Sequence, residues 1–250
     1  MKIGFYGDSY CVKLDSLHCQ YHKYQTYIKL VKNHYNAEII NLGVGGSSYW
    51  DLMLKQFPPA LNNLPDICIF CWTDPSRIFN PSIRNLGSWV MEKINYMDHP
   101  GHVLNRNAYL AAQKYFTHLY DDEKACRESL SAFYFFDREV LAPIQDKTKI
   151  IHLWSFGIPR NTDFNDIYIP TNLDYIYRWK TGVELRPSLK CFGNLSGDVL
   201  DDGPVPNHLY GNLNNKLLAD FIIEAINDHH NGKLLTKDDI VEQNRLYKIS

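Results

Sequence analysis

Long apolar segments are missing from this 250-residue chain. The longest notable apolar run, from Ile67 to Trp72, is far shorter than the roughly 20 residues that a membrane-spanning helix needs. The first residues, Met1 to Gly7, enter a strand-like segment without the cationic stretch and the apolar segment of about 7 to 15 residues that mark an export signal. The sequence therefore predicts no membrane partner, and no export signal is visible in it. The expected location is the cytoplasm or is unassigned.

An excess of charge of one sign is also missing. Lys and Arg number 26 and Asp and Glu number 28, so the net charge is -2, and the basic residues form no dense cluster. Nucleic acid is not expected as a main partner, because binding to a phosphate backbone depends on such a cluster.

Cysteine is scarce, and the six that occur do not form the dense framework of a small disulfide-rich protein. They stand at positions 11, 19, 68, 71, 126 and 191. Cys68 and Cys71 have the C-x-x-C spacing, but they fall in an apolar segment that we interpret as a strand. Residues three apart in a strand point to opposite faces, so a thioredoxin-like pair is not expected and the thiols should be reduced.

Apolar residues themselves are plentiful, at 45% of the chain with 14% aromatic residues. At this length they suffice for a sizeable core without disulfide or metal support. We expect a single domain over residues 1–250, with an irregular or helical insertion around 75–145. A long loop region is expected at 157–206, where prolines recur and no periodicity is clear.

The first third of the chain alternates between strand-like and helix-like segments. Apolar strand-like runs occur at Lys2 to Tyr6, Glu38 to Leu42 and Asp66 to Trp72, and helical spacing occurs around Tyr21 to Val31 and from about Tyr49 to Leu61, with Pro58-Pro59 near the end of the latter. Such alternation predicts a parallel sheet with right-handed crossovers. The turns that follow the strands should then share one edge of the sheet, where ligand sites of α/β proteins usually lie.

Further elements are expected along the rest of the chain. Apolar residues recur at helical spacing at Tyr109, Ala112, Phe116 and Leu119, at Leu130, Phe133, Phe136 and Val140, and at Leu209, Leu213, Leu217, Phe221 and Ala225. Lys149 to Ser155 has the composition of another buried strand. The sequence thus predicts an α/β fold with a central parallel sheet.

Three polar turns should meet at the shared edge of this sheet. They are Gly7-Asp8-Ser9 after the first strand, Gly43 to Ser48 after the second, and Trp72-Thr73-Asp74 after the third. His208 lies directly before the last helix, from where it could fold back onto the same edge. The set offers a nucleophile, hydrogen-bond donors and a base.

Together these segments resemble the SGNH, or GDSL, hydrolase superfamily, which contains esterases, lipases and carbohydrate deacetylases. Gly7-Asp8-Ser9 resembles its first block, the Asn-Leu-Gly-Val-Gly-Gly run at 41–46 its second, Pro65-Asp66 with Trp72-Thr73-Asp74 its third, and Asn207-His208-Leu209 its fifth. The resemblance implies a flavodoxin-like three-layer α/β/α sandwich. It also implies that Ser9 is the nucleophile and that the amide of Gly46 donates to the oxyanion.

The chemistry expected of these residues follows from general principles. A serine hydroxyl is a poor nucleophile until a base accepts its proton, which is the role expected of His208. Attack on an ester creates a tetrahedral oxyanion, and the backbone amides of Ser9 and Gly46 could stabilise that charge. No cofactor is expected, because the reaction needs none.

The third block departs from the family, which normally presents an asparagine amide to the oxyanion. This chain has Asp74 there, and an ionised carboxylate accepts hydrogen bonds without donating them. Loss of one such donor typically costs roughly 100 to 1,000-fold in turnover. Arg77 could neutralise Asp74, or Thr73 or Asn80 could donate in its place.

The fifth block departs as well, because the family's orienting acid stands three residues before the histidine and this chain has Val205 there. Asp202 or Asp201 could reach His208 through the turn at Gly203-Pro204. A histidine that lacks an orienting acid can lose up to about 10,000-fold in rate, although a backbone carbonyl can replace the acid weakly.

Two other kinds of site are not favoured. His18, Cys19 and His22 have a spacing that would suit a metal, with Cys11 nearby, but no second cluster accompanies them. Gly43 to Ser48 departs from the dinucleotide-binding fingerprint at its last glycine and follows the second strand. We therefore expect no metal and no nucleotide cofactor.

The sequence predicts a serine ester hydrolase, of the esterase or carbohydrate O-deacetylase type, that acts through an acyl-enzyme on Ser9. Its partner would be a small-molecule or carbohydrate ester, contacted by Asp8, Tyr10, Trp72 and Arg77, while Tyr49 and Trp50 could also shape the pocket. The alternative is a catalytically impaired binding or structural module that kept the fold, because Asp74 and Val205 depart from the family. The substrate and the oligomeric state are left open.

Overall fold

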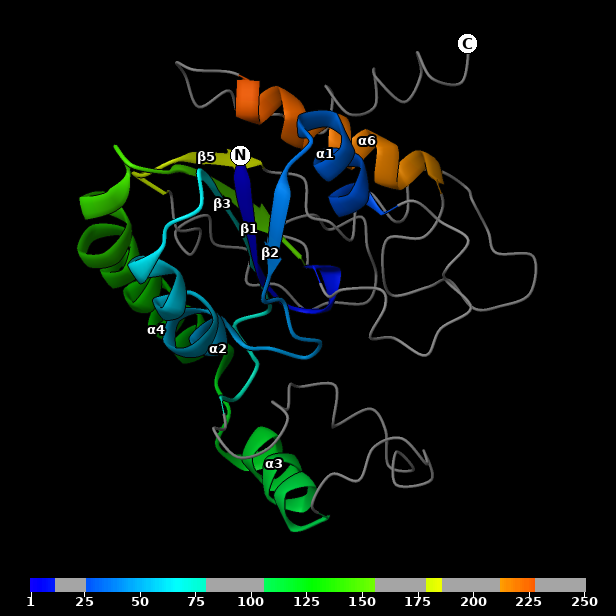
Figure 1. Cartoon of the computed structure of the whole chain (residues 1–250). Coiled ribbons are helices and arrows are strands. Elements are labelled where there is room, and N and C mark those ends of the chain that lie inside the picture. The colour runs from blue at the N-terminus through cyan, green and yellow to red at the C-terminus, as the bar shows by residue number, and fades with distance from the viewer. Residues whose placement is uncertain (12–25, 80–105, 156–178, 186–211, 228–250) are drawn as a thin grey trace.

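A computed structural model describes residues 1–11, 26–79, 106–155, 179–185 and 212–227. Its sheet has five strands, namely β1 (Lys2–Gly7), β2 (Glu38–Asn41), β3 (Ile67–Trp72), β4 (Lys149–Trp154) and β5 (Val183–Leu185). All neighbouring strands are parallel and their order is β2-β1-β3-β4-β5 (Figure 1). This is the flavodoxin-like order, so the predicted fold class is confirmed.

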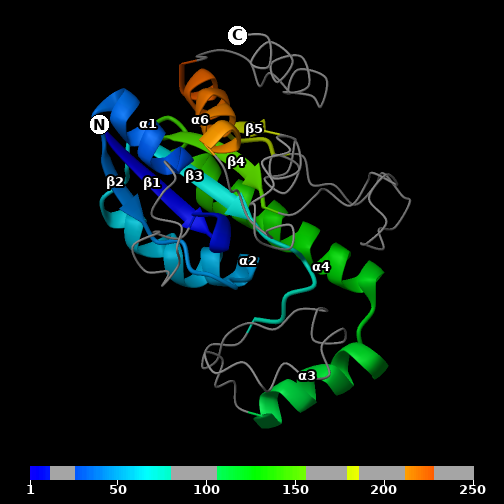
Figure 2. The ribbon, with the colours of Figure 1, turned by 90° about the vertical axis from the view of Figure 1, so that its right-hand side faces the viewer.

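Helices cover both faces of the sheet (Figures 1 and 2). One layer holds α1 (Tyr27–Tyr35) and α6 (Asn212–Asn227), which pack against each other. The opposite layer holds α2 (Tyr49–Asp51) with the π-helix η4 (Leu52–Gln56) and the 3₁₀ helix η5 (Pro58–Asn62), and α4 (Asp122–Phe135) with η8 (Phe136–Leu141) and η9 (Ala142–Ile144). The predicted three layers are therefore present.

The strand β3 shows why the sheet needs both layers, because all six of its residues are buried. Ile67, Ile69 and Cys71 belong to the apolar cluster under α1 and α6, and Cys68 belongs to the opposite cluster. Side chains alternate between faces along a strand, so a strand covered on both sides must be apolar throughout. Cys68 and Cys71 are free thiols on opposite faces, as predicted.

The helix expected from 49 to 61 is wrong in detail. Regular α-helix ends at Asp51, and the amide of Phe57 then donates to the carbonyl of Leu52, at 3.0 Å, in the five-residue spacing of a π-helix. Pro58 and Pro59 lack the N–H groups that would continue α-helical bonds, so a 3₁₀ helix follows. The π-helix ends at Gln56, whose side chain contacts the first turn of the site described below.

Two further expectations need correction. The helix α3 (Arg106–His118) buries Tyr109, Ala112 and Phe116 as predicted, in a small cluster with Ile78 that lies apart from the sheet, but Leu119 is exposed. Leu119 lies beyond the end of the helix, where the helical spacing no longer applies. The strand β5 was not predicted, because three residues are too few to show a period of two.

Other predicted elements are confirmed. The strand expected at Lys149 to Ser155 is β4, and the helix expected at the end of the chain is α6, which buries Leu217, Phe221 and Ala225. Leu209, the first residue of that predicted spacing, lies outside the described residues. No helix among the described residues has the length and apolar character to cross a membrane.

Candidate active site

The strand order reverses direction between β1 and β3, so the carboxyl ends of these two strands are the expected place for a ligand. The chain leaves β1 through α1 to β2 on one side, and later returns through α2 to β3 on the other side. Ligands of open α/β sheets bind at such a switch in strand order. Ser9 follows β1 and Thr73 follows β3, and the register pairs Gly7 with Cys71 just before them.

The first turn presents Ser9 at the start of a 3₁₀ helix, η1 (Ser9–Cys11). Asp8 holds this turn, because its Oδ1 accepts the amide of Tyr10 at 3.1 Å and its carbonyl accepts the amide of Cys11 at 3.1 Å. Ser9 is half-buried, and neither its hydroxyl nor its amide hydrogen-bonds to another described residue. Among the described residues, both groups are therefore unengaged at the carboxyl end of β1.

Gly7 allows β1 to approach β3 closely where the turn begins. Its φ of 148° is one that residues with a side chain rarely adopt. A Cβ there would overlap the carbonyl oxygen of Cys71 and lie 2.7 Å from the Cβ of Cys71. Position 7 therefore requires glycine.

Gln56 holds the first turn through its side chain, a role that was not predicted from the sequence. Its Oε1 accepts the amide of Gly7 at 2.6 Å, and its Nε2 donates to the carbonyl of Gly7 at 2.9 Å and to the hydroxyl of Ser47 at 3.0 Å. The side chain is buried. A polar residue at helical spacing from the apolar Leu52 and Met53 was the available signal, because that spacing places it on the buried face.

The second turn lies beside the first. The amide of Val44 donates to the carbonyl of Gly7 at 3.0 Å, and the amide of Ser47 closes a β-turn on the carbonyl of Val44 at 3.1 Å. Gly46 has a φ of 79°, the value that a type II turn requires at its third residue. The amide of Gly46 donates to no other described residue.

The third turn is built by Asp74. Its Oδ1 accepts the amide of Ser76 at 2.7 Å, and its carbonyl accepts the amide of Arg77 at 3.3 Å. The carboxylate thus stabilises its own turn, as Asp commonly does. The hydroxyl of Thr73 is buried and has no hydrogen-bond partner among the described residues. Asn80, the other predicted donor, lies outside them.

The guanidinium of Arg77 lies beside the carboxylate of Asp8 and forms no ion pair with that of Asp74 among the described residues. Its Nη1 lies 3.5 Å from Oδ2 of Asp8 and donates to the carbonyl of Ser47 at 2.7 Å. The expectation that Arg77 neutralises Asp74 is therefore wrong, because the turn that Asp74 forms directs the arginine side chain toward the first and second turns. The hydroxyl of Ser155, after β4, also donates to Oδ1 of Asp8, at 2.8 Å.

The residues predicted to contact a substrate differ in exposure. The side chains of Asp8, Tyr10 and Trp72 are buried, while that of Arg77 is 11% exposed. Trp72 donates its indole N–H to Nδ1 of His152 at 3.0 Å and stacks on Trp179. In this arrangement the buried side chains support the turns from beneath, and their contact with a substrate stays a prediction.

His152 of β4 contacts Trp72, the residue before the third turn, but it is unsuited to act as a base. It is completely buried, and burial lowers its pKa to about 3. Nδ1 accepts from Trp72, and Nε2 lies 3.0 Å from the carbonyl of Thr181, to which a neutral ring would donate. Both ring nitrogens are occupied, so His152 is a core residue.

The remaining predicted site residues lie outside the described residues. These are the base His208, the orienting acid Asp202 with its alternative Asp201, and the departure at Val205. The same holds for His18, Cys19 and His22. Within the ranges that the structure describes, no three His, Cys, Asp or Glu side chains gather as metal ligands.

Cys11, which follows the first turn, has a raised pKa. Burial is the main cause and the neighbouring Cys71 thiol adds to it, so the thiol of Cys11 is neutral.

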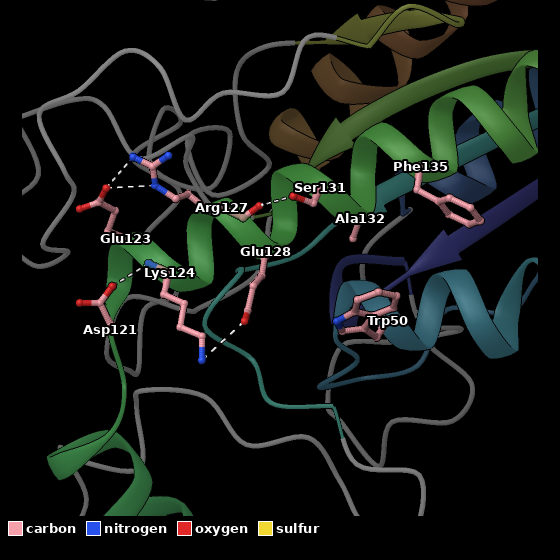
Figure 3. A pocket seen from close by; sticks show the side chains of 9 residues that line it. All are labelled: Trp50, Asp121, Glu123, Lys124, Arg127, Glu128, Ser131, Ala132 and Phe135. Carbon is pink, nitrogen blue, oxygen red and sulfur yellow. Dashed lines mark hydrogen bonds and ion pairs between the residues drawn. The ribbon is translucent and has the colours of Figure 1, made fainter.

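A groove of about 760 Å³ runs along α4 (Figure 3). Trp50 of α2, Ala132 and Phe135 line one end of it, and charged side chains line the other end. The charged residues pair along the helix, Arg127 with Glu123 at 2.7 Å and Lys124 with Glu128 at 3.7 Å. Trp50 is the one residue of the groove that we expected near a substrate.

The chain matches no family model and no curated protein. Among solved structures it is similar to a variant of an acetyl-xylooligosaccharide esterase of Geobacillus stearothermophilus, with 12% identity, a TM-score of 0.49, and coverage of 91% of this chain and 94% of that one. It is also similar to a GDSL-like lipase, named as putative, of Parabacteroides merdae, with 13% identity, a TM-score of 0.44, and coverage of 90% and 94%. At these values the likeness concerns the course of the chain alone.

Proposed function

We propose that this protein is a serine ester hydrolase that acts through an acyl-enzyme on Ser9. The observation that carries the proposal is the placement of Ser9 at the carboxyl end of β1, beside the switch in strand order, with its hydroxyl and amide unengaged by other described residues. The amide of Gly46 is also unengaged, and the turn that carries it is bonded to Gly7.

The proposed reaction begins when Oγ of Ser9 attacks the ester carbonyl carbon while a base, His208 in the proposal, accepts the hydroxyl proton. The amides of Ser9 and Gly46 donate to the oxyanion of the tetrahedral intermediate. Collapse of this intermediate breaks the ester bond and releases the alcohol, which takes the proton from the base. Water then attacks the acyl-enzyme, and the acid leaves as Ser9 regains its proton.

Rigid support of both amides favours this proposal. A catalytic group must be held close to its productive position, since a displacement of about 1 Å can cost roughly 100-fold in rate. Gln56 bonds both backbone groups of Gly7 and the hydroxyl of Ser47, so the first and second turns share one buried anchor.

We propose small acyl esters as substrates, including O-acetyl groups on carbohydrates.

The test combines hydrolysis with covalent labelling. Wild-type protein should release the chromophore from a short-chain acetyl ester and should be labelled by a fluorophosphonate at Ser9, as located by mass spectrometry. Ser9→Ala should abolish both, because it removes the nucleophile, whereas Thr117→Ala, which changes an exposed hydroxyl on α3, should change neither. If wild-type protein shows neither hydrolysis nor labelling, the proposal fails and the binding-module alternative is favoured.

A further inference from the structure

Arg77 links the first and second turns from the third. Its Nη1 donates to the carbonyl of Ser47 at 2.7 Å and lies 3.5 Å from Oδ2 of Asp8. Ser47 directly follows Gly46, and Asp8 directly precedes Ser9. A single guanidinium nitrogen therefore contacts the chain neighbours of both proposed oxyanion donors.

Asp8 needs a cation at this place. Its side chain is completely buried, and Oδ1 already accepts bonds from Tyr10 and Ser155. Oδ2 has no hydrogen-bond partner among the described residues, and the guanidinium of Arg77 is its neighbouring positive charge. A buried carboxylate is costly unless it is paired, so the position of Asp8 depends on Arg77.

The third turn positions Arg77 for this contact. Asp74 caps the turn through Ser76 and accepts the amide of Arg77 itself. Arginine suits the task because its planar guanidinium carries several donors and remains charged, whereas the lysine ammonium is a compact point charge. The guanidinium can face a carboxylate and a carbonyl together.

We propose that Arg77 is a positioning residue for the hydrolysis. Held between Asp8 and Ser47, its guanidinium keeps the amides of Ser9 and Gly46 directed at one point, where the oxyanion forms. The proposal rests on the proposed function for its catalytic consequence, but the link between the two turns is a property of the fold alone. It assigns Arg77 to the support of the site and not to substrate binding.

The first experiment separates support from substrate binding through kcat and KM. Arg77→Met should lower kcat by roughly 100-fold while KM stays within about threefold of the wild-type value. The kcat of Arg77→Lys should lie between that of the wild type and that of Arg77→Met. Guanidinium added to Arg77→Ala at a non-denaturing concentration should restore part of the lost kcat. Arg138→Met, which changes an exposed arginine on η8, is the matched control and should behave as wild type. A rise in KM with kcat unchanged, or no effect, would overturn the proposal.

The second experiment does not depend on catalysis. Hydrogen exchange is measured by mass spectrometry on Arg77→Met and on wild-type protein. Backbone amides in the peptides that cover 7–11 and in those that cover 43–49 should exchange faster in the variant, by about tenfold or more. Peptides of α1 and α6 should be unchanged, which shows that the variant is folded, and Arg138→Met should exchange as wild type. Unchanged exchange in either turn contradicts the link. If wild-type protein has no esterase activity, the proposed function fails, while this measurement still decides whether Arg77 joins the turns.

Discussion

The side-chain amide of Gln56 hydrogen-bonds both backbone groups of Gly7, accepting from its N–H at 2.6 Å and donating to its carbonyl at 2.9 Å. Gln56 is the last residue of the π-helix η4. π-helical turns are rare and occur often at functional sites. Gly7, which Gln56 holds, stands two residues before the proposed nucleophile, Ser9.

Gln56→Ala should destabilise the protein and reduce its activity. It leaves the N–H of Gly7 without its side-chain partner, and one buried unsatisfied group costs about 1–3 kcal/mol. The carbonyl of Gly7 still accepts the amide of Val44, and the hydroxyl of Ser47 still donates to the carbonyl of Val44. We expect a loss of about 2 kcal/mol in the free energy of unfolding, measured by urea denaturation. The control Gln145→Ala removes an exposed glutamine and should change it by less than about 0.5 kcal/mol. Equal stability of the two variants would contradict the role of Gln56.

Asp74 can be tested with two substitutions that separate its turn from its charge. Asp74→Asn keeps a side-chain oxygen that can accept from Ser76 and adds an N–H donor, so kcat should rise, by about tenfold, if the charge opposes the oxyanion. Asp74→Ala removes the acceptor, so the turn that carries Arg77 should loosen and kcat should fall. A fall in kcat for Asp74→Asn would show that the carboxylate itself has a positive role.

His208 and Asp202 carry the proposed proton transfer. His208→Ala should lower kcat/KM by roughly 1,000-fold or more, because Ser9 then lacks its base, and Asp202→Asn should lower it by roughly 100-fold if Asp202 orients the imidazole. The control His118→Ala changes an exposed histidine on α3 and should leave kcat/KM unchanged. An unaltered rate for Asp202→Asn would leave Asp201 or a backbone carbonyl as the orienting group.

His152 should make stability fall in mild acid. Its pKa is lowered from 6.5 to about 3 in the folded protein, so below pH 6.5 the unfolded chain binds a proton that the folded chain does not. The contribution of His152 to the free energy of unfolding is fully present above pH 6.5. Below pH 6.5 it declines by about 1.4 kcal/mol per pH unit, until about pH 3.

Urea denaturation at pH 7 and pH 5 measures this effect. The free-energy difference between wild type and His152→Gln should shrink by about 2 kcal/mol on going to pH 5, because glutamine does not titrate. His34→Gln, at an exposed position of α1, should instead keep the wild-type pH dependence. A difference that does not vary with pH would show that His152 is not held neutral by burial.

The fold was largely predictable because its signals are local. Apolar runs such as Ile67 to Trp72 mark doubly covered strands, and the spacing of Leu217, Phe221 and Ala225 marks α6. The site was predictable as far as the ends of β1, β2 and β3, since parallel strands bring their following turns to one edge.

The contacts within the site were not predictable, because they join distant residues or depend on turn geometry. Ser155 bonds Asp8 across 147 residues, and nothing local to either residue indicates the pair. Arg77 stands three residues after Asp74, which suggested that the two would pair. The carboxylate is instead engaged by the amide of Ser76, and the guanidinium reaches Asp8.

The two sides of the sheet differ in aromatic content, and this has a consequence for spectroscopy. The four tryptophans that the structure describes, Trp50, Trp72, Trp154 and Trp179, all lie in or against the cluster beneath α2 and α4. The opposite cluster, beneath α1 and α6, contains Tyr27 and packs against Tyr35. The fluorescence of these four tryptophans therefore reports on the side of the sheet that α2 and α4 cover. Loosening of the side covered by α1 and α6 would leave their emission nearly unchanged.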